Sequence, residues 1–341
     1  MYSNEKKVNK LFLNWLSICL LLVFSIIIVG GLTRLTNSGL SITQWELFSG
    51  ILPPLNESAW IEYFDQYKQI PQYQLLNFDM NLDEFKIIFY WEYYHRILAR
   101  IIGIFFLIPL VFFYFSKKIR FEYINICYLI FSLIVFQGIV GWFMVKSGLI
   151  EDVTVSHYRL SIHLTTAVII LSIIFWLIKN VSLKYNKAFF SFNKNNLPFQ
   201  ILILLIFFQL VIGAFVSGLD AGKIYQTWPK MGNTFFPSDF ILNNVINIFE
   251  FDNHSLVQFY HRTLAYIIIL YSVYLSILIF KKKMFVLYKP LKIVIFFIFF
   301  QVALGIFTLI SGLNIYLASL HQITGVFLVL SALNLYYFKV N

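Results

Sequence analysis

The chain has 341 residues, of which 60% are hydrophobic and 12% are charged, and its formal net charge is +10. Soluble domains carry about twice this charged fraction, so the composition excludes an ordinary soluble protein, and its apolar content excludes a disordered chain. Two cysteines also exclude a disulfide-stabilised scaffold. The composition therefore predicts a membrane protein.

Eight segments are long and apolar enough to cross a bilayer, which takes about 20 residues. They lie at residues 11–31, 87–115, 124–145, 156–178, 199–217, 255–280, 290–311 and 316–338. The first segment is too long for a cleaved signal peptide and lacks a small-residue cleavage site, so we expect it to remain as a span. The predicted fold class is an all-α polytopic membrane protein.

The basic residues are distributed unevenly between the two sides of the membrane. Sixteen of the 26 lysines and arginines fall at the two termini and in the loops after spans 2, 4 and 6. The positive-inside rule places these loops, and both termini, in the cytoplasm. No Arg-rich, acid-poor transit segment precedes the first span, which favours a bacterial inner membrane. The net charge thus describes topology, and nucleic acid is not expected as a partner.

Two long connections, residues 32–86 and 218–254, lie on the outer side. Both are rich in Trp, Tyr, Pro and Asn. Long ordered loops in compact proteins tend to be functional, so we interpret both as lids over an outer-facing site. Unstructured surface loops are the alternative.

The two halves of the chain repeat one another. Three motifs recur in the same order, at separations of 158 to 166 residues: EYYHR (92–96) with FYHR (259–262), FQGIVGWFMVKSGL (136–149) with FQVALGIFTLISGL (300–313), and HLTTA (163–167) with HQITG (321–325). Each repeat has an even number of spans, so the halves share one orientation. This predicts two pseudo-twofold-related four-helix bundles, residues 1–180 and 181–341.

Four histidines lie inside predicted spans, one on each even-numbered span: His95, His163, His261 and His321. Each follows the outer end of its span by about six to nine residues, so all four share a depth of roughly 10 Å. Ionisable residues in hydrocarbon are costly and usually functional. Histidines on facing helices can supply two axial ligands to a haem, which predicts the pairs His95 with His163 and His261 with His321.

Other metals fit less well. Zinc needs clustered His, Cys or carboxylate ligands, and copper oxidase sites need adjacent histidines on one helix; the sequence offers neither. A structural role, with the histidines bonding neighbouring helices, is the alternative. His157 and His254 lie at span mouths, where we expect them to meet water. Cys19 and Cys127 lie in spans and are expected to be core thiols without a disulfide.

Glu92 lies three residues before His95 and therefore on nearly the same helix face. A carboxylate there can act on protons or cations at the macrocycle. Its counterpart in the second half is Gln258, which indicates one catalytic pocket and one electron-relay pocket. Alternatively, Glu92 pairs with Arg96 or Arg100.

Several arginines lie near the outer helix ends and suit haem propionates, whose carboxylates favour bidentate partners. They are Arg34, Arg96, Arg100, Arg159 and Arg262. Anchoring at the membrane interface is their alternative role.

The motifs together resemble the haem A synthase family, in the branch of alphaproteobacteria and mitochondria, and the likeness covers all eight spans. The motifs are GGLTRLTNSGLSITQW (30–45), EYYHRILAR (92–100), GWFMVKSGL (141–149), SHYRLSIHL (156–164), TWPKM (227–231), FDNHSLVQFYHRTLAY (251–266) and HQITG (321–325).

The resemblance implies oxidation of the C8 methyl group of haem O to a formyl group, by successive hydroxylations, to give haem A for cytochrome c oxidase. It implies that His261 and His321 ligate a permanent haem b. It further implies that His95 and His163 serve the haem O site and that Glu92 is the catalytic carboxylate. Haem O, haem A, the farnesyltransferase that makes haem O, an electron donor and membrane lipids are the expected partners.

The chain departs from the family in two places. Some bacterial members carry cysteine pairs in the outer loops, whereas these loops hold no cysteine here. Ala99 stands where relatives usually have Gly. A di-haem membrane cytochrome b that carries electrons is the second hypothesis, which the histidines alone fit equally well. A transporter ranks lower, because its polar residues would lie near mid-bilayer.

Overall fold

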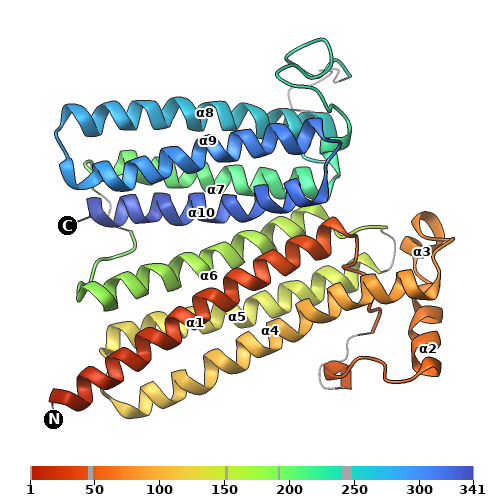
Figure 1. Ribbon diagram of the computed structural model, residues 1–341, viewed down its shortest axis with the longest axis horizontal. Helices are drawn as coiled ribbons and strands as arrows, with labels where there is room; N and C mark the ends of the chain where they lie inside the picture. The colour runs from red at the N-terminus through yellow and green to blue at the C-terminus, as the bar shows by residue number, and fades with distance from the viewer. Residues whose placement is uncertain (1, 45–48, 150–152, 191–192, 240–247, 341) are drawn as a thin grey trace. The chain divides into compact units, whose positions relative to one another are not determined.

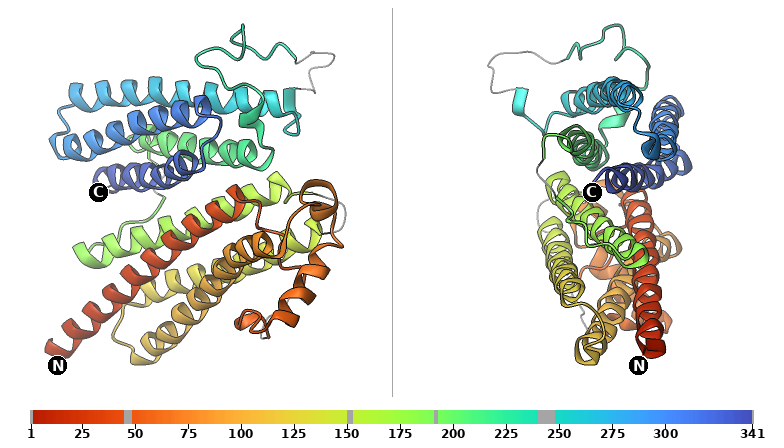
Figure 2. Two further views of the ribbon diagram at one scale, coloured as in Figure 1. Left: turned by 45° about the vertical axis from the view of Figure 1, so that its right-hand side comes forward. Right: turned by 90° about the vertical axis from the view of Figure 1, so that its left-hand side faces the viewer.

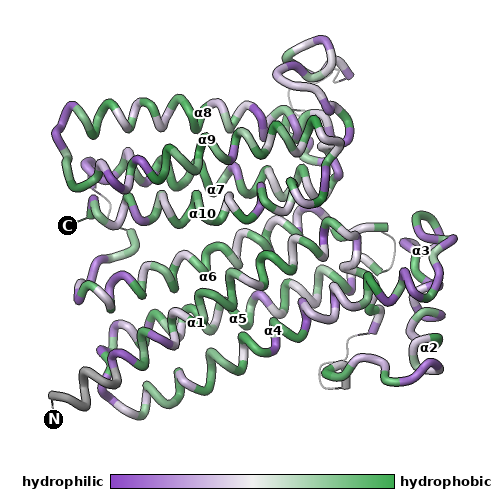
Figure 3. The backbone as a smooth tube through the Cα atoms, viewed as in Figure 1, coloured by the Kyte–Doolittle hydropathy of each residue, from purple (hydrophilic) through white to green (hydrophobic). Residues whose placement is uncertain are grey.

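The computed structural model describes residues 2–44, 49–149, 153–190, 193–239 and 248–340. Within these ranges the chain forms ten α-helices and no β-strand (Figure 1). Eight of the helices are long and apolar enough to span a membrane, which confirms the predicted class of fold. Figure 3 shows their apolar middles, with polar residues concentrated at the ends and in the connections.

The spanning helices are α1 (Tyr2–Leu35), α4 (Leu82–Ser116), α5 (Phe121–Gly148), α6 (His157–Leu183), α7 (Leu197–Gly218), α8 (His254–Lys281), α9 (Tyr288–Ile310) and α10 (Ile315–Lys339). Several extend beyond the apolar segments. Helix α4 starts before its apolar segment because Asn81 and Glu84 form a capping box there, which satisfies free backbone N–H groups. The polar first turns of α4 thus continue one long helix.

The chain divides into two compact units, Met1–Leu183 and Lys184–Asn341. In the first, α1 packs against α4 and α6, and α5 packs against the same two helices. In the second, α7 and α9 each pack against both α8 and α10. The end view in Figure 2 shows the four helices of each unit side by side. In each bundle, therefore, the two histidine-bearing helices lie diagonally opposite one another.

The connection between α1 and α4 contains two further helices, α2 (Glu57–Tyr67) and α3 (Pro71–Leu76). Trp60, Phe64 and Tyr67 pack against Phe85 and Phe89 at the start of α4. Burial raises the pKa of Tyr67 to about 12, and its hydroxyl donates to Gln72 at 3.0 Å. This connection is thus held on the outer end of α4 by an aromatic cluster.

The connection between α7 and α8 begins with the short 3-10 helix η2 (Ala221–Lys223) and continues as an irregular loop. Asp239 in this loop accepts hydrogen bonds from Tyr225 Oη at 2.5 Å and Ser255 Oγ at 2.6 Å. Burial opposes ionisation of Asp239, but these two bonds outweigh it and lower the pKa of the carboxyl. Asp239 thereby fastens the loop to the first turn of α8.

Candidate functional site

In the first unit, α4 and α6 bring His95 and His163 together across the bundle. Their ring centres are 6.3 Å apart and the ring planes cross at 58°. Both histidines are partly buried among apolar helices. The sequence-based pairing of these two residues therefore matches their positions in the bundle.

In the second unit, α8 and α10 place His261 and His321 in the same relationship. Their ring centres are again 6.3 Å apart, with the planes crossing at 76°. The two bundles thus present histidine pairs of one separation.

This separation suits one metal ion bound between each pair of rings. An imidazole nitrogen lies about 2 Å from a metal that it ligates, and a ring centre lies about 1.1 Å further away, so two opposed ligands have centres about 6.2 Å apart. No group of three or more His, Cys, Asp or Glu side chains with metal-binding geometry occurs among the described residues. Two imidazoles without further protein ligands fit a haem, whose porphyrin supplies the remaining four positions.

A glycine lies against each histidine, on the membrane-spanning helix preceding the one that carries the histidine. A Cβ atom added at Gly30 would lie 2.9 Å from His95 Cε1, and one added at Gly141, Gly213 or Gly305 would lie 3.1 Å from the Cε1 of His163, His261 or His321. Real Cβ contacts are rarely this short. The ring positions therefore require a residue without a side chain at these four places.

Three glutamines hold the histidine-bearing turns through their backbone. Gln137, Gln209 and Gln301 each donate to a histidine carbonyl: to His163 O at 2.6 Å, to His261 O at 3.0 Å and to His321 O at 2.9 Å. Each glutamine precedes one of the facing glycines by four residues, one helical turn. The sequence analysis missed Gln209 and Gly213, although FQxxxG occurs three times and would have identified them.

Glu92 lies on α4 one turn before His95 and is 3% exposed. Its carboxylate accepts hydrogen bonds from Ser41 Oγ at 2.7 Å, from the Ile42 backbone N–H at 2.9 Å and from Arg96 Nε at 3.0 Å. Arg96 also forms a salt bridge with Glu92 through Nη2. The pairing of Glu92 with Arg96, an alternative from the sequence, is therefore present, and the α1–α4 connection closes over it.

The second unit repeats this arrangement without a carboxylate. Gln258, also 3% exposed, donates to Tyr225 O at 2.9 Å. Arg262 donates to Tyr225 O at 2.8 Å and to Thr227 O at 2.9 Å. Arg96 makes the matching contact in the first unit, donating to Ile42 O at 2.9 Å. Both arginines thus bind the connection above their own histidine pair, and the acid occurs in one bundle alone.

Three other residues considered in the sequence analysis lie in the first or last turn of a spanning helix. Arg34 donates to Asn37 Oδ1 at 2.7 Å, beyond the end of α1. Arg159 contacts Ser147 and lies 4.9 Å from the centre of the Phe143 ring. The expectation that His157 meets water is wrong, because its ring packs 4.0 Å from that of Tyr158 and the residue is 7% exposed.

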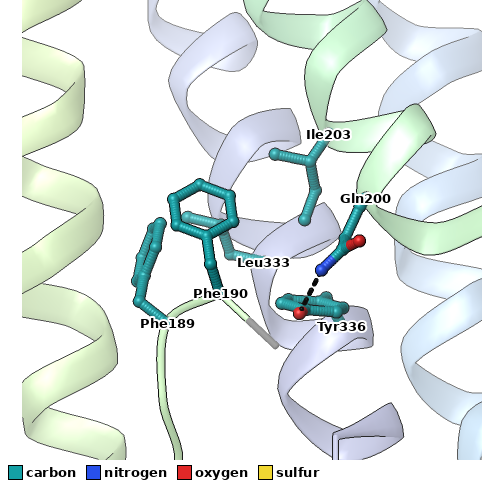
Figure 4. A pocket seen from close by; sticks show the side chains of 6 residues that line it. All are labelled: Phe189, Phe190, Gln200, Ile203, Leu333 and Tyr336. Carbon is teal, nitrogen blue, oxygen red and sulfur yellow. Dashed lines mark hydrogen bonds between the residues drawn. The ribbon is translucent and has the colours of Figure 1, made fainter. Parts of the chain in front are cut away.

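Two small hollows lie away from the histidine pairs. One is lined by Tyr93, Arg96 and Arg100 together with residues of the α1–α4 connection. The other lies in the second unit, about four turns along α10 from His321. Figure 4 shows its lining, in which Gln200 donates to Tyr336 Oη at 2.8 Å and Phe190 and Leu333 lie beside this pair.

The fold and the site together define a multi-pass membrane protein that carries a histidine pair in each of two helical bundles. The chain belongs to the COX15-CtaA family of cytochrome oxidase assembly proteins, whose family model matches residues 13–333.

Individual relatives are similar over nearly the whole chain. The haem A synthase of Pelagibacter ubique is 49% identical over 328 residues, covering 95% of each chain. That of Flavobacterium psychrophilum is 39% identical over 324 residues, covering 93% of this chain and 94% of the relative. That of Allorhizobium ampelinum is 43% identical over 264 residues, covering 76% of this chain and 71% of the relative.

Proposed function

We propose that the chain is a haem A synthase, which oxidises the C8 methyl group of haem O to a formyl group by successive hydroxylations and loss of water. The observation that carries the proposal is the contrast between two like histidine pairs, of which one lies beside a buried carboxylate. Family membership over residues 13–333 supports it. A di-haem electron carrier would need no such difference between its bundles.

In this proposal His95 and His163 hold haem O in the first bundle, and Glu92 is the catalytic residue beside it. The Ser41 hydroxyl, the Ile42 N–H and the Arg96 guanidinium all donate hydrogen bonds to the Glu92 carboxylate and hold it in place. A carboxylate so held can bind a proton released near the methyl group or orient a polar group there. The α1–α4 connection, which supplies Ser41 and Ile42, would exclude water from this pocket.

In the second bundle, His261 and His321 would hold a permanent haem b. Bound there, a haem with two axial imidazoles supplies one-electron transfer. Gln258 is uncharged, and it donates to the Tyr225 carbonyl in the α7–α8 connection. Residues 1–180 would thus bind the substrate, and residues 181–341 would carry the electrons.

The arginines would contribute to the same sites. Arg34, Arg96 and Arg262 are proposed to meet haem propionates at the outer rim. Arg96 and Arg262 already bind lid carbonyls, so a propionate would share their guanidinium groups with the lids. The distribution of basic loops supports a location in a bacterial inner membrane with both termini in the cytoplasm. Haem O would come from its farnesyltransferase, and a separate donor would supply electrons.

Deleting the gene and extracting the cellular haems tests the function. We expect haem O to accumulate and haem A to be absent, with recovery on return of the wild-type gene. A normal haem A content in the deletion strain would refute the proposal. Loss of electron transfer with haem A unchanged would support the carrier instead.

A further inference from the structure

Three of the four histidine-bearing turns are tied to a neighbouring helix by a glutamine, and the fourth is not. Gln137, Gln209 and Gln301 tie His163, His261 and His321. In α1 the residue four before the facing glycine, Gly30, is Ile26. Among the described residues, no side chain bonds the His95 carbonyl, so His95 sits on the one histidine-bearing turn lacking this tie.

The Gln209 amide lies close to the imidazole ring of His261 as well as to its backbone carbonyl. Gln209 Nε2 is 3.2 Å from His261 Nδ1 and 3.3 Å from His261 Nε2. Gly325, four residues after His321, leaves room for Gln301, because a Cβ atom there would lie 2.7 Å from Gln301 Nε2. Helix α10 thus has space at Gly325 for the Gln301 amide.

Each of these glutamines also has an unused acceptor. The Oε1 atoms of Gln137, Gln209 and Gln301 are buried and have no hydrogen-bond partner among the described residues, and the same holds for Nδ1 of His95, His163 and His321. An imidazole that ligates a metal through one nitrogen carries its proton on the other, and an acceptor for that proton fixes the ring's tautomer and orientation. The glutamine amide can therefore bind both the backbone carbonyl and the ring.

We propose that Gln137, Gln209 and Gln301 are positioning residues that fix the axial histidines, and that the absence of a glutamine at position 26 makes His95 the releasable ligand. The second bundle then has two tied ligands and suits a retained haem. The first bundle has one ligand whose carbonyl binds a glutamine and one whose carbonyl does not, and it suits a haem that must enter and leave. The assignment of substrate to the first bundle rests on the proposed function; the role of the three glutamines does not.

Substituting the two glutamines of the second bundle tests whether they position the axial histidines. Gln209→Met and Gln301→Met keep the side-chain length and remove the amide. We expect both variants to bind haem b, to shift the low-spin electron paramagnetic resonance signal, and to lose haem to apomyoglobin about three to ten times faster, as one interhelical hydrogen bond predicts. Gln200→Met is the matched control on α7, because Gln200 binds Tyr336 and should change neither property.

Introducing a glutamine at position 26 tests whether its absence makes His95 the releasable ligand. Ile26→Gln should raise the amount of haem O plus haem A that stays with the purified protein at least about threefold, with the haem b spectrum unchanged. Ile26→Leu is the control and should leave the retained amount as in the wild type. The unchanged haem b spectrum also reports that the variant is folded.

The proposal is overturned if Gln209→Met and Gln301→Met match the wild type in both resonance signal and haem loss. It is also overturned if Ile26→Gln retains no more haem than Ile26→Leu. These outcomes are distinct from failure of the proposed function, in which the wild-type protein binds haem and converts no haem O to haem A.

Discussion

Arg96 Nε lies 3.0 Å from Glu92 Oε1, one turn along α4, so the acid beside the first histidine pair is a paired, buried carboxylate. In the second bundle the same two positions hold Gln258 and Arg262, and Arg262 binds lid carbonyls there. The first bundle therefore carries a carboxylate–guanidinium pair where the second carries an amide and a guanidinium, although the ring centres of both histidine pairs are 6.3 Å apart.

Glu92→Gln should abolish haem A formation while leaving haem b bound. The substitution gives the first bundle the residue of the second, and loss of a general acid–base group typically costs about 10²- to 10⁴-fold in rate. Haem A formed per haem b, measured by chromatography of extracted haems, checks it. Gln258→Glu, added to Glu92→Gln, is the companion variant. It should not restore haem A formation. Unaltered haem A formation in Glu92→Gln would refute the catalytic role.

Alanine at a facing glycine should displace the histidine that it faces. Gly213→Ala and Gly305→Ala each place a Cβ atom 3.1 Å from an imidazole carbon, so we expect a perturbed low-spin spectrum and lower haem b content. Gly103 and Gly138, on spanning helices, have nothing within 4 Å of an added Cβ. Gly103→Ala and Gly138→Ala should therefore keep the spectrum. Equal spectra in both groups would contradict the assigned contacts.

His261→Ala or His321→Ala should remove the low-spin b-type spectrum from the purified protein, because one axial ligand is lost. His95→Ala should keep that spectrum, since His95 lies in the other bundle. His254→Ala, at the first residue of α8, is a further control and should change nothing. Survival of the b-type spectrum in His261→Ala would show that the ligand pair is assigned wrongly.

The hydrogen bonds by which Asp239 holds the α7–α8 connection to α8 should weaken in acid. The folded pKa of Asp239 lies below its unfolded value of about 3.9, so its contribution to stability is present above that pH and is lost as pH falls through the folded pKa. Pepsin cleavage within residues 218–254 should be faster in Asp239→Asn than in the wild type near pH 5. The two rates should converge as the pH falls through the folded pKa. A constant ratio across this range would exclude the role of Asp239.

Much of the fold could be predicted because its signals are local. Runs of apolar residues fix the spans, and a repeated YHR motif aligns His95 with His261. The contacts of Glu92 could not be predicted, because Ser41 and Ile42 lie in an irregular connection some 50 residues away. Gln209 was missed for a different reason: its counterpart in the first half is Ile26, so a comparison of the halves conceals it.

The central claim is tested most directly by expressing this chain in a host that makes haem O and no haem A, and analysing the extracted haems by chromatography. The account predicts that haem A appears with the wild-type chain and is absent with Glu92→Gln, although both proteins show the b-type spectrum. Haem O alone, from cells in which the wild-type chain carries haem b, would contradict it.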